Sequence, residues 1–371
     1  RQTYEEYFAR IKSGDPSKLV VIIDEAQFVA KRDASFMEAV AKLKKHKLYP
    51  GPVLIILATS STVWATQEAA EQFRGAEMKI ESLNFLEVVR HFESLPVAEI
   101  VRIYGAIGGV PAYLDKWDAS KSFKDNICRL VLTPSGALYG EADAVIAAEL
   151  RELSAYSTIL AAIARGENKL NDIFHATGFS RAKISVYLKN LATFNIVEKV
   201  VSFETGGWEN AKKGVYQIKD TFVNFWFKFV YPNMSNLYLL SPEEFYDTYI
   251  EKELDAYLER YFREVCTEYL LILNQMGQLP FTIKRVGTWI GKTGRIDIVA
   301  QSEDRRSIIG FCNWDKPMMT MDMCENMAMA MDQARLTSDD YYLFSATDFE
   351  PALQSYVVRD PRFKLINMNE L

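Results

Sequence analysis

Two short apolar runs near the start of the chain predict buried parallel strands. Residues 19–23 read LVVII and residues 53–57 read VLIIL, and continuous apolar runs of this length are typical of strands covered on both faces. Between them, residues 36–50 carry apolar side chains at helical spacing and end at a proline. The order strand, helix, strand predicts a parallel α/β unit.

A similar pattern predicts three helices and a hairpin in the middle of the chain. Apolar spacing indicates the helices over residues 152–166, 170–178 and 180–195. Gly178 lies at the turn between the last two, where a helix-turn-helix needs a glycine. A strand, a glycine-rich tip and a returning strand follow over residues 196–220. This order is typical of a winged helix.

The last part of the chain changes to a helix followed mainly by strands. Residues 220–233 are densely aromatic at helical spacing and predict a core or interface helix. After them, the pattern predicts a long helix (residues 245–277) and three strands (281–291, 295–304 and 305–315). A helix (321–336) and a last strand (340–346) follow.

Polar residues follow both N-terminal strands. Asp24 and Glu25 come directly after the first strand, and Thr59, Ser60 and Ser61 end the second. The carboxyl ends of parallel strands meet at one edge of a sheet, where open α/β folds bind ligands. The pattern predicts a Walker B motif, in which Asp24 holds the water shell of Mg²⁺ and Glu25 polarises the attacking water, beside a sensor 1 hydroxyl on Ser60. The alternative is a strand that ends in a solvated acidic turn.

The phosphate loop that normally precedes a Walker B motif is not found in this sequence. It requires G-x-x-x-x-G-K-[S/T] between a strand and a helix, and only one glycine, Gly14, precedes the first strand. Residues 291–293 read GKT, but Val286 stands where the first glycine belongs and the flanks predict strands rather than a helix. We therefore expect no bound cofactor and no ATP hydrolysis from this chain alone.

Residues 108–114 read GGVPAYL, and with this segment the chain resembles the archaeal-type AAA-like ATPases, a family that also occurs in bacteria. In that family a Gly-Gly-x-Pro-x-Tyr-Leu signature lies in a short lid after sensor 1. The resemblance implies a multidomain α/β and α+β fold that lacks the strand, phosphate loop and helix at its front. Its parts are a partial P-loop NTPase α/β domain (residues 1–84), a helical lid (85–148), a winged helix-turn-helix (149–235) and a restriction-endonuclease-like α/β domain (236–371).

The same resemblance implies a nuclease fold without its metal site. Asp297 falls where the first metal-binding acid belongs, and Glu264 where the family often has an accessory acid. The family pattern Gly-Glu-Cys-Lys-Trp reads GFCNW at residues 310–314, so Phe311 replaces the glutamate and Asn313 replaces the lysine. An aromatic ring cannot ligate Mg²⁺ and an amide supplies no charge. We expect no nuclease activity and no metal here.

Basic residues are expected on the outer face of the winged helix. They are Arg181, Lys183 and Lys189 on the last helix, with Tyr187 exposed beside them, and Lys212 and Lys213 at the wing tip. Such cations suit major-groove and phosphate contacts with DNA. In the alternative interpretation, they only solvate the outer faces of a winged helix that packs between the ATPase part and the C-terminal domain. Both interpretations stay open.

Composition adds limits on the partners. The 371 residues carry a net charge of −6, which argues against a protein that coats nucleic acid over its whole surface. Four scattered cysteines without a CxxC pair fit neither a zinc site nor a disulfide scaffold and indicate the cytoplasm. No apolar run approaches the roughly 18 residues of a membrane span, so we expect no membrane contact. The methionine-rich residues 318–331 predict a core or partner groove, which leaves a protein partner or self-association open.

Two functional hypotheses follow. In the first, the complete protein is an ATP-dependent switch, with ATP and Mg²⁺ bound between a phosphate loop and Asp24, Glu25 and Ser60, and nucleotide state repositions the winged helix relative to the C-terminal domain. In the second, the chain is a non-enzymatic DNA- or protein-binding module with a vestigial ATPase domain. Retained DNA affinity without nucleotide would favour the second.

Overall fold

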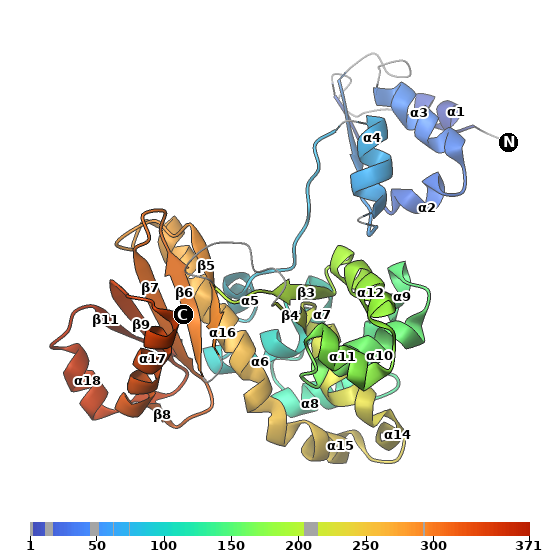
Figure 1. Cartoon of the computed structure of the whole chain (residues 1–371). Helices are drawn as coiled ribbons and strands as arrows, with labels where there is room; N and C mark the ends of the chain where they lie inside the picture. Colours follow the sequence, from blue (N-terminus) through green and yellow to red (C-terminus); the bar gives the residue numbers. More distant parts are fainter. Residues whose placement is uncertain are drawn as a thin grey trace. The chain divides into compact units, whose positions relative to one another are not determined.

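The computed structural model forms two compact units, Arg1–Glu81 and Ser82–Leu371, drawn in blue and in the remaining colours of Figure 1. Both contain helices and strands, so the protein has a mixed α/β architecture. The structure describes residues 3–11, 18–44, 52–61, 63–73, 75–203, 214–291 and 294–371. Within these ranges, no helix combines the length and the apolar character that crossing a bilayer requires.

The first unit is built on a two-stranded parallel sheet, β1 and β2, as the sequence predicts. The strands pair from Leu19 opposite Val53 to Ile23 opposite Leu57. Helices α1 and α3 and the helical turn η1 pack against one face of the sheet and form a small apolar core. The elements are α1 (Tyr4–Ala9), β1 (Leu19–Ile23), α2 (Ala26–Ala30), α3 (Ala34–Lys44), β2 (Val53–Leu57), η1 (Trp64–Ala69) and α4 (Ala70–Phe73).

The other face of this sheet is open within the described residues, which corrects the prediction of strands covered on both faces. Val20, Ile22, Leu54 and Ile56 are 57%, 67%, 56% and 42% exposed. Alternate side chains of a strand point to opposite faces, and these four share the face opposite the core. Apolar side chains on a parallel sheet are normally covered by a further layer.

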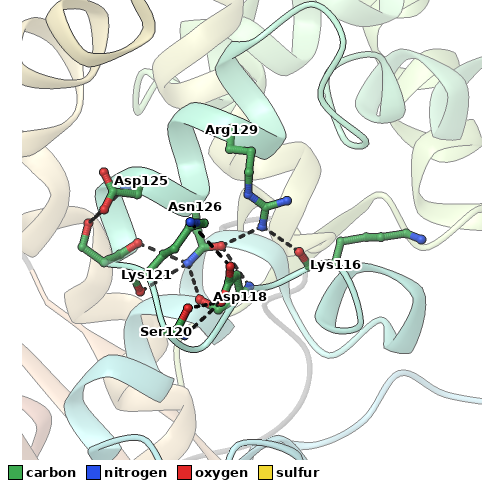
Figure 2. A network of polar contacts seen from close by, with 8 residues as sticks. Lys116, Asp118, Ser120, Lys121, Asp125, Asn126 and Arg129 are labelled. Carbon is green, nitrogen blue, oxygen red and sulfur yellow. Dashed lines mark hydrogen bonds and ion pairs between the residues drawn. The ribbon is translucent and has the colours of Figure 1, made fainter.

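The second unit begins with short helices that cover residues predicted as a lid. They are α5 (Phe85–His91), α6 (Val97–Ile107), α7 (Pro111–Leu114), α8 (Phe123–Ile127), η2 (Cys128–Leu132) and α9 (Glu141–Glu149). Figure 2 shows how the buried side chain of Asn126 fixes the turn before α8. Its amide donates to the carbonyl of Asp118 at 2.9 Å, and its oxygen accepts from Asp118 N–H at 3.0 Å and from Arg129 at 2.9 Å. These polar groups are used inside the protein, so the network has a structural role.

A three-helix segment with a two-stranded hairpin follows, and its helices and strands agree with the predicted pattern. Helix α11 ends at Gly178, which has φ of 69°, and Ser180 caps α12 by accepting from Lys183 N–H. Strands β3 and β4 pair antiparallel. The elements are α10 (Leu153–Ala164), α11 (Leu170–Thr177), α12 (Arg181–Thr193), β3 (Val197–Val200) and β4 (Val215–Ile218).

The aromatic segment after β4 is core, as predicted from its composition. Phe222, Phe225, Trp226, Phe227 and Phe229 are at most 2% exposed. They belong to one continuous apolar cluster that also includes buried residues of the short helices before α10, of the three-helix segment and of the C-terminal sheet. The segment comprises α13 (Thr221–Phe225), η4 (Trp226–Val230), η5 (Tyr231–Asn233), α14 (Met234–Leu237) and α15 (Pro242–Tyr249).

The last part is a five-stranded sheet in the order β11-β9-β7-β6-β5. Strands β5, β6 and β7 form an antiparallel meander, whereas β7, β9 and β11 run parallel. The long helix α16 packs against β6 and β7, and α17 packs against β6 (Figure 1). The elements are α16 (Glu251–Gln275), β5 (Arg285–Ile290), β6 (Arg295–Gln301), β7 (Ser307–Asn313), β8 (Met318–Met319), α17 (Met321–Ala334), β9 (Asp340–Ser345), β10 (Asp348–Phe349), α18 (Pro351–Val357), β11 (Phe363–Asn367) and η6 (Met368–Glu370).

The two glycines of the GGVPAYL segment have separate structural reasons. Gly108 ends α6 with φ of 68° and ψ of −159°, a conformation that residues with a Cβ rarely adopt. At Gly109, a Cβ would lie 1.9 Å from the backbone oxygen of Leu83, and Leu83 N–H donates to the Gly109 carbonyl at 2.8 Å. The signature therefore lets the chain before α5 lie directly against the end of α6.

Replacing Gly109 tests this close approach. Gly109→Ala should lower the free energy of unfolding by about 1–3 kcal/mol, because the added methyl group has to displace backbone atoms. Urea unfolding measures the change. Gly75→Ala is the matched control, since its Cβ would meet nothing within 4 Å, and it should stay within about 0.5 kcal/mol of the wild type. Equal stabilities of the two variants would contradict the assigned packing.

Candidate functional site

A polar cluster lies at the carboxyl edge of β1 and β2. Ala58 N–H donates to the carbonyl of Ile23 at 2.9 Å, and Ala26 N–H donates to the carbonyl of Ala58 at 3.0 Å. The two chains therefore stay paired beyond the strands. This pairing brings the acids that follow β1 next to the hydroxyl residues that follow β2.

Glu25 accepts three hydrogen bonds through one carboxylate oxygen. Its Oε2 accepts from the hydroxyl of Ser60 at 2.9 Å, from the backbone N–H of Ser60 at 3.2 Å and from the side-chain amide of Gln27. The bonds from Gln27 and then from Ser60 lower the pKa of Glu25 below its ordinary value of 4.5. Glu25 has φ of 48° and ψ of 42°, which is rare for a residue other than glycine and carries a strain of order 1–3 kcal/mol.

Gln27 joins the two sides of this cluster, and the sequence did not single it out. Its Nε2 also donates to Ser60 Oγ at 3.1 Å, and its Oε1 accepts from the hydroxyl of Thr59 at 2.7 Å. Gln27 is buried. A polar residue at the start of the short helix after the two acids was the available signal, but only the fold shows that it faces the second strand.

Asp24 lies beside this cluster but is held differently. It is exposed, and its Oδ1 accepts from Glu25 N–H at 3.0 Å. The structure thus brings Glu25 and Ser60 into direct contact and leaves Asp24 at the surface of the same edge. Glu25 is partnered by neutral donors, which orient its carboxylate and favour the charged form without cancelling the charge. Such a group can attract a cation or polarise a water molecule.

A buried acid, Asp297, lies on β6 in the C-terminal sheet. Its carboxylate is 3% exposed and forms ion pairs with Arg295 at 2.8 Å and with Arg263 of α16 at 3.4 Å. Oδ2 also accepts from Cys312 N–H at 3.1 Å. Burial, and next the charge of Arg295, lower the pKa of Arg263. Two guanidinium groups therefore neutralise the carboxylate that the family resemblance assigns to metal binding.

The other three residues of the expected degenerate site have different surroundings. Asn313 is buried, and its amide donates to Ser345 Oγ at 3.1 Å and to Lys316 O at 3.2 Å, so it ties the end of β7 to β9 and to the next turn. Phe311 packs against the apolar cluster formed by the sheet and α17. Glu264 is exposed and forms an ion pair with Arg260 at 2.8 Å.

A cavity of about 630 Å³ opens beside Asp297. Its walls come from α16, β6, β7 and α17, and they include Phe311 and Asn313 but not Glu264. The predicted methionine-rich helix supplies Met323, Met327 and Met329. Within the described residues, no group of three or more histidine, cysteine, aspartate or glutamate side chains could hold a metal ion.

The cations predicted on α12 are exposed, whereas the tyrosine predicted beside them is not. Arg181, Lys183 and Lys189 lie on the outer face. Tyr187 is buried, with its ring centroid 4.4 Å from that of Tyr156, which corrects the expectation of an exposed ring. Its hydroxyl donates to Glu152, outside α12, and this explains how a polar tip is accommodated inside. Lys212 and Lys213 lie outside the described residues.

Comparisons with known proteins find a family model that matches part of the chain and a relative that matches most of it. Residues 226–329 match DUF234, described as archaeal and bacterial proteins of unknown function. An uncharacterised protein of Methanocaldococcus jannaschii is 28% identical over 322 residues, which cover 85% of this chain and 70% of that protein. The crystal structure of protein VC1899 from Vibrio cholerae aligns over 100% of this chain and 93% of its own, at 11% identity and a TM-score of 0.24, too low to show a shared fold. The DUF234 match includes α16, β6 and β7, and therefore the surroundings of Asp297.

The hydrogen bonds at Glu25 give a pH-dependent prediction. Ser60→Ala should raise the pKa of Glu25 toward 4.5, because the carboxylate loses a donor. Because the pKa of Glu25 is lower in the folded unit than in the unfolded chain, its ionised carboxylate stabilises the folded unit at pH values above the unfolded pKa. This contribution is lost as the pH falls through the folded pKa. NMR titration of the Glu25 carboxyl measures the shift. Ser35→Ala removes the comparable hydrogen bond to Asp33 and should leave the pKa of Glu25 unchanged. If the pKa of Glu25 also stayed unchanged in Ser60→Ala, the hydrogen-bond geometry at Glu25 would be contradicted.

The ion pairs of Asp297 predict a large effect on stability. Asp297→Ala should reduce the free energy of unfolding by about 3 kcal/mol, since it leaves the half-buried Arg263 beside Arg295 without its ion-pair partner. Urea unfolding gives the value. Asp315→Ala, which removes the partner of the exposed Lys316 in the same cavity wall, should change stability little. A small loss for Asp297→Ala would mean that the two guanidinium groups do not depend on this carboxylate.

Proposed function

We propose that Arg1–Glu81 contributes the Walker B and sensor 1 residues of an ATP-hydrolysing P-loop domain. The observation that carries the proposal is the contact between Glu25 and Ser60 at the carboxyl edge of two parallel strands. In ATPases of this type, the acid at the end of the strand holds the Mg²⁺ water shell and the next acid polarises the attacking water. We assign these roles to Asp24 and Glu25, and Ser60 orients the γ-phosphate or that water.

The orientation of Glu25 supports this assignment. Neutral donors hold its oxygen in place, and its pKa is lowered, so the carboxylate is charged at neutral pH. A fixed, charged carboxylate whose charge is not cancelled by a cation suits a group that polarises water. The strained backbone at Glu25 is a further feature that concentrates at functional sites.

The open face of the sheet supports the proposal that β1 and β2 form only part of a nucleotide-binding sheet. Val20, Ile22, Leu54 and Ile56 present an apolar surface where a parallel α/β sheet normally carries a second layer of helices. Because this sequence has no phosphate-loop motif, we propose that the complete ATPase acquires its phosphate loop, strand and covering helix from another part of the protein. ATP and Mg²⁺ then bind between that loop and the acids after β1.

We further propose identities for the parts of Ser82–Leu371. Residues 85–148 form the lid, and residues 149–235 form a winged helix, for which the order α10, α11, α12, β3, β4 is the support. Residues 236–371 form a nuclease-like domain, supported by the order helix, antiparallel meander, helix and parallel strand. The neutralised Asp297 and the replacement of acid and lysine by Phe311 and Asn313 support loss of nuclease activity.

Nucleotide binding and turnover test the ATPase assignment. Calorimetry should detect no Mg-ATP binding to this chain and clear binding to a version extended upstream to include a phosphate loop. In the extended version, Glu25→Gln should retain ATP binding and reduce kcat by about 10²–10⁴-fold, because the amide cannot act as a base. The matched control is Glu38→Gln, an exposed acid of α3, which should leave kcat unchanged. Unchanged turnover in Glu25→Gln would remove the assigned role.

A further inference from the structure

We propose that the outer face of α12 binds double-stranded DNA in the major groove, independently of ATP. The exposed residues of this face include Arg181, Lys183, Ser185, Val186 and Lys189. From Ser180 to Thr193 the chain contains no acidic residue, although the whole protein has 49 acidic and 43 basic side chains. An acid-free cationic helix face on an acidic protein is a local electrostatic feature of the kind that attracts phosphate backbones.

The first two basic residues of this face, Arg181 and Lys183, are positioned by neutral groups. The guanidinium of Arg181 lies over the ring of Phe174 at 4.1 Å and donates from Nη2 to Asn171 Oδ1 at 2.6 Å. The ammonium of Lys183 lies over the ring of Phe179 at 4.4 Å. Within the described residues, neither is paired with a carboxylate. Their charges are therefore held in place without being neutralised, which lowers the ordering cost of binding an anion.

The inner face of α12 is fixed by the rest of the second unit. Ile184, Leu188 and Leu191 are at most 2% exposed and belong to the shared apolar core. The ring of Tyr187 packs at a tilt against that of Tyr156, and its hydroxyl donates to Glu152. The helix is thus held along its length on one side and presents a continuous rigid surface on the other. DNA-binding helices of the helix-turn-helix type are held in this manner.

Double-stranded DNA fits the composition and size of this surface. A helix of about 10–12 Å diameter enters the B-DNA major groove, which is about 12 Å wide. Val186 is 57% exposed between the cations, and a small apolar side chain in that place can contact a thymine methyl group. Cations at the N-terminal end of such a helix reach base edges, and a later cation reaches phosphate. The deep, narrow major groove of double-stranded RNA does not admit a helix.

Fluorescence anisotropy of the whole chain with a labelled DNA duplex tests the proposal. At physiological salt we expect a Kd of about 10⁻⁴–10⁻⁶ M, typical of sequence-independent binding. The triple variant Arg181→Ala, Lys183→Ala, Lys189→Ala should weaken binding at least about tenfold and reduce the slope of log K against log salt by about 2–3. The control triple variant Lys116→Ala, Lys121→Ala, Lys252→Ala has the same change in net charge away from α12 and should keep nearly all of the affinity.

Two further measurements distinguish DNA binding by α12 from DNA binding elsewhere on the protein and from RNA binding. Val186→Asp places an acid at an exposed position, so it should preserve the thermal unfolding curve and abolish binding. A double-stranded RNA of the same sequence should bind at least about tenfold more weakly than the DNA. The proposal is overturned by undetectable DNA binding at about 50 mM salt, by equal losses in both triple variants, or by equal affinity for the RNA. It is equally overturned if the α12 substitutions weaken binding to a protein and leave DNA binding unchanged. None of these results bears on ATP hydrolysis, which is measured at Glu25.

Discussion

One continuous apolar core holds the second unit together. The aromatic residues from Phe222 to Phe229 lie at its centre, and the buried faces of α6, α10, α12, α16 and the C-terminal sheet all join it. Burial of a single large apolar side chain contributes about 1.5–3 kcal/mol, so separating any of these parts would expose surface worth many such contributions. The short helices before α10, the three-helix segment and the sheet therefore behave as one body. A nucleotide signal that moved α12 relative to the C-terminal sheet would have to break this core, whereas movement of the whole unit would not.

Two buried or half-buried carboxylates show how similar acids acquire different properties. Glu25 is surrounded by an amide, a hydroxyl and a backbone N–H, all neutral, and its charge remains available to a partner. Asp297 lies between two guanidinium groups, which use its charge inside the protein. The nature of the donors, rather than the degree of burial alone, separates a carboxylate suited to chemistry from one that stabilises the fold.

Sequence patterns predicted the features that depend on neighbouring residues. The parallel strands at residues 19–23 and 53–57, the helices of the three-helix segment and the aromatic core segment follow from local periodicity. The pairing of Glu25 with Ser60 also followed, because parallel strands align their carboxyl ends. Features that depend on distant contacts were missed: the link from Gln27 to Thr59, the pairing of Arg263 with Asp297, and the burial of Tyr187, which requires Tyr156 and Glu152. Strand composition likewise could not show that the described residues leave one face of β1 and β2 open, because coverage depends on what packs against the sheet.

The start of the second unit is attached at two places within a few residues. Leu83 lies in the space left by Gly109 at the end of α6, and the carboxylate of Glu268 on α16 accepts from Phe85 N–H at 3.1 Å and from Leu86 N–H at 3.2 Å. A tension applied to the preceding chain would therefore be delivered directly to α6 and α16 instead of first unravelling α5. The GGVPAYL segment and Glu268 thus fasten the start of α5 to two helices of the core at once.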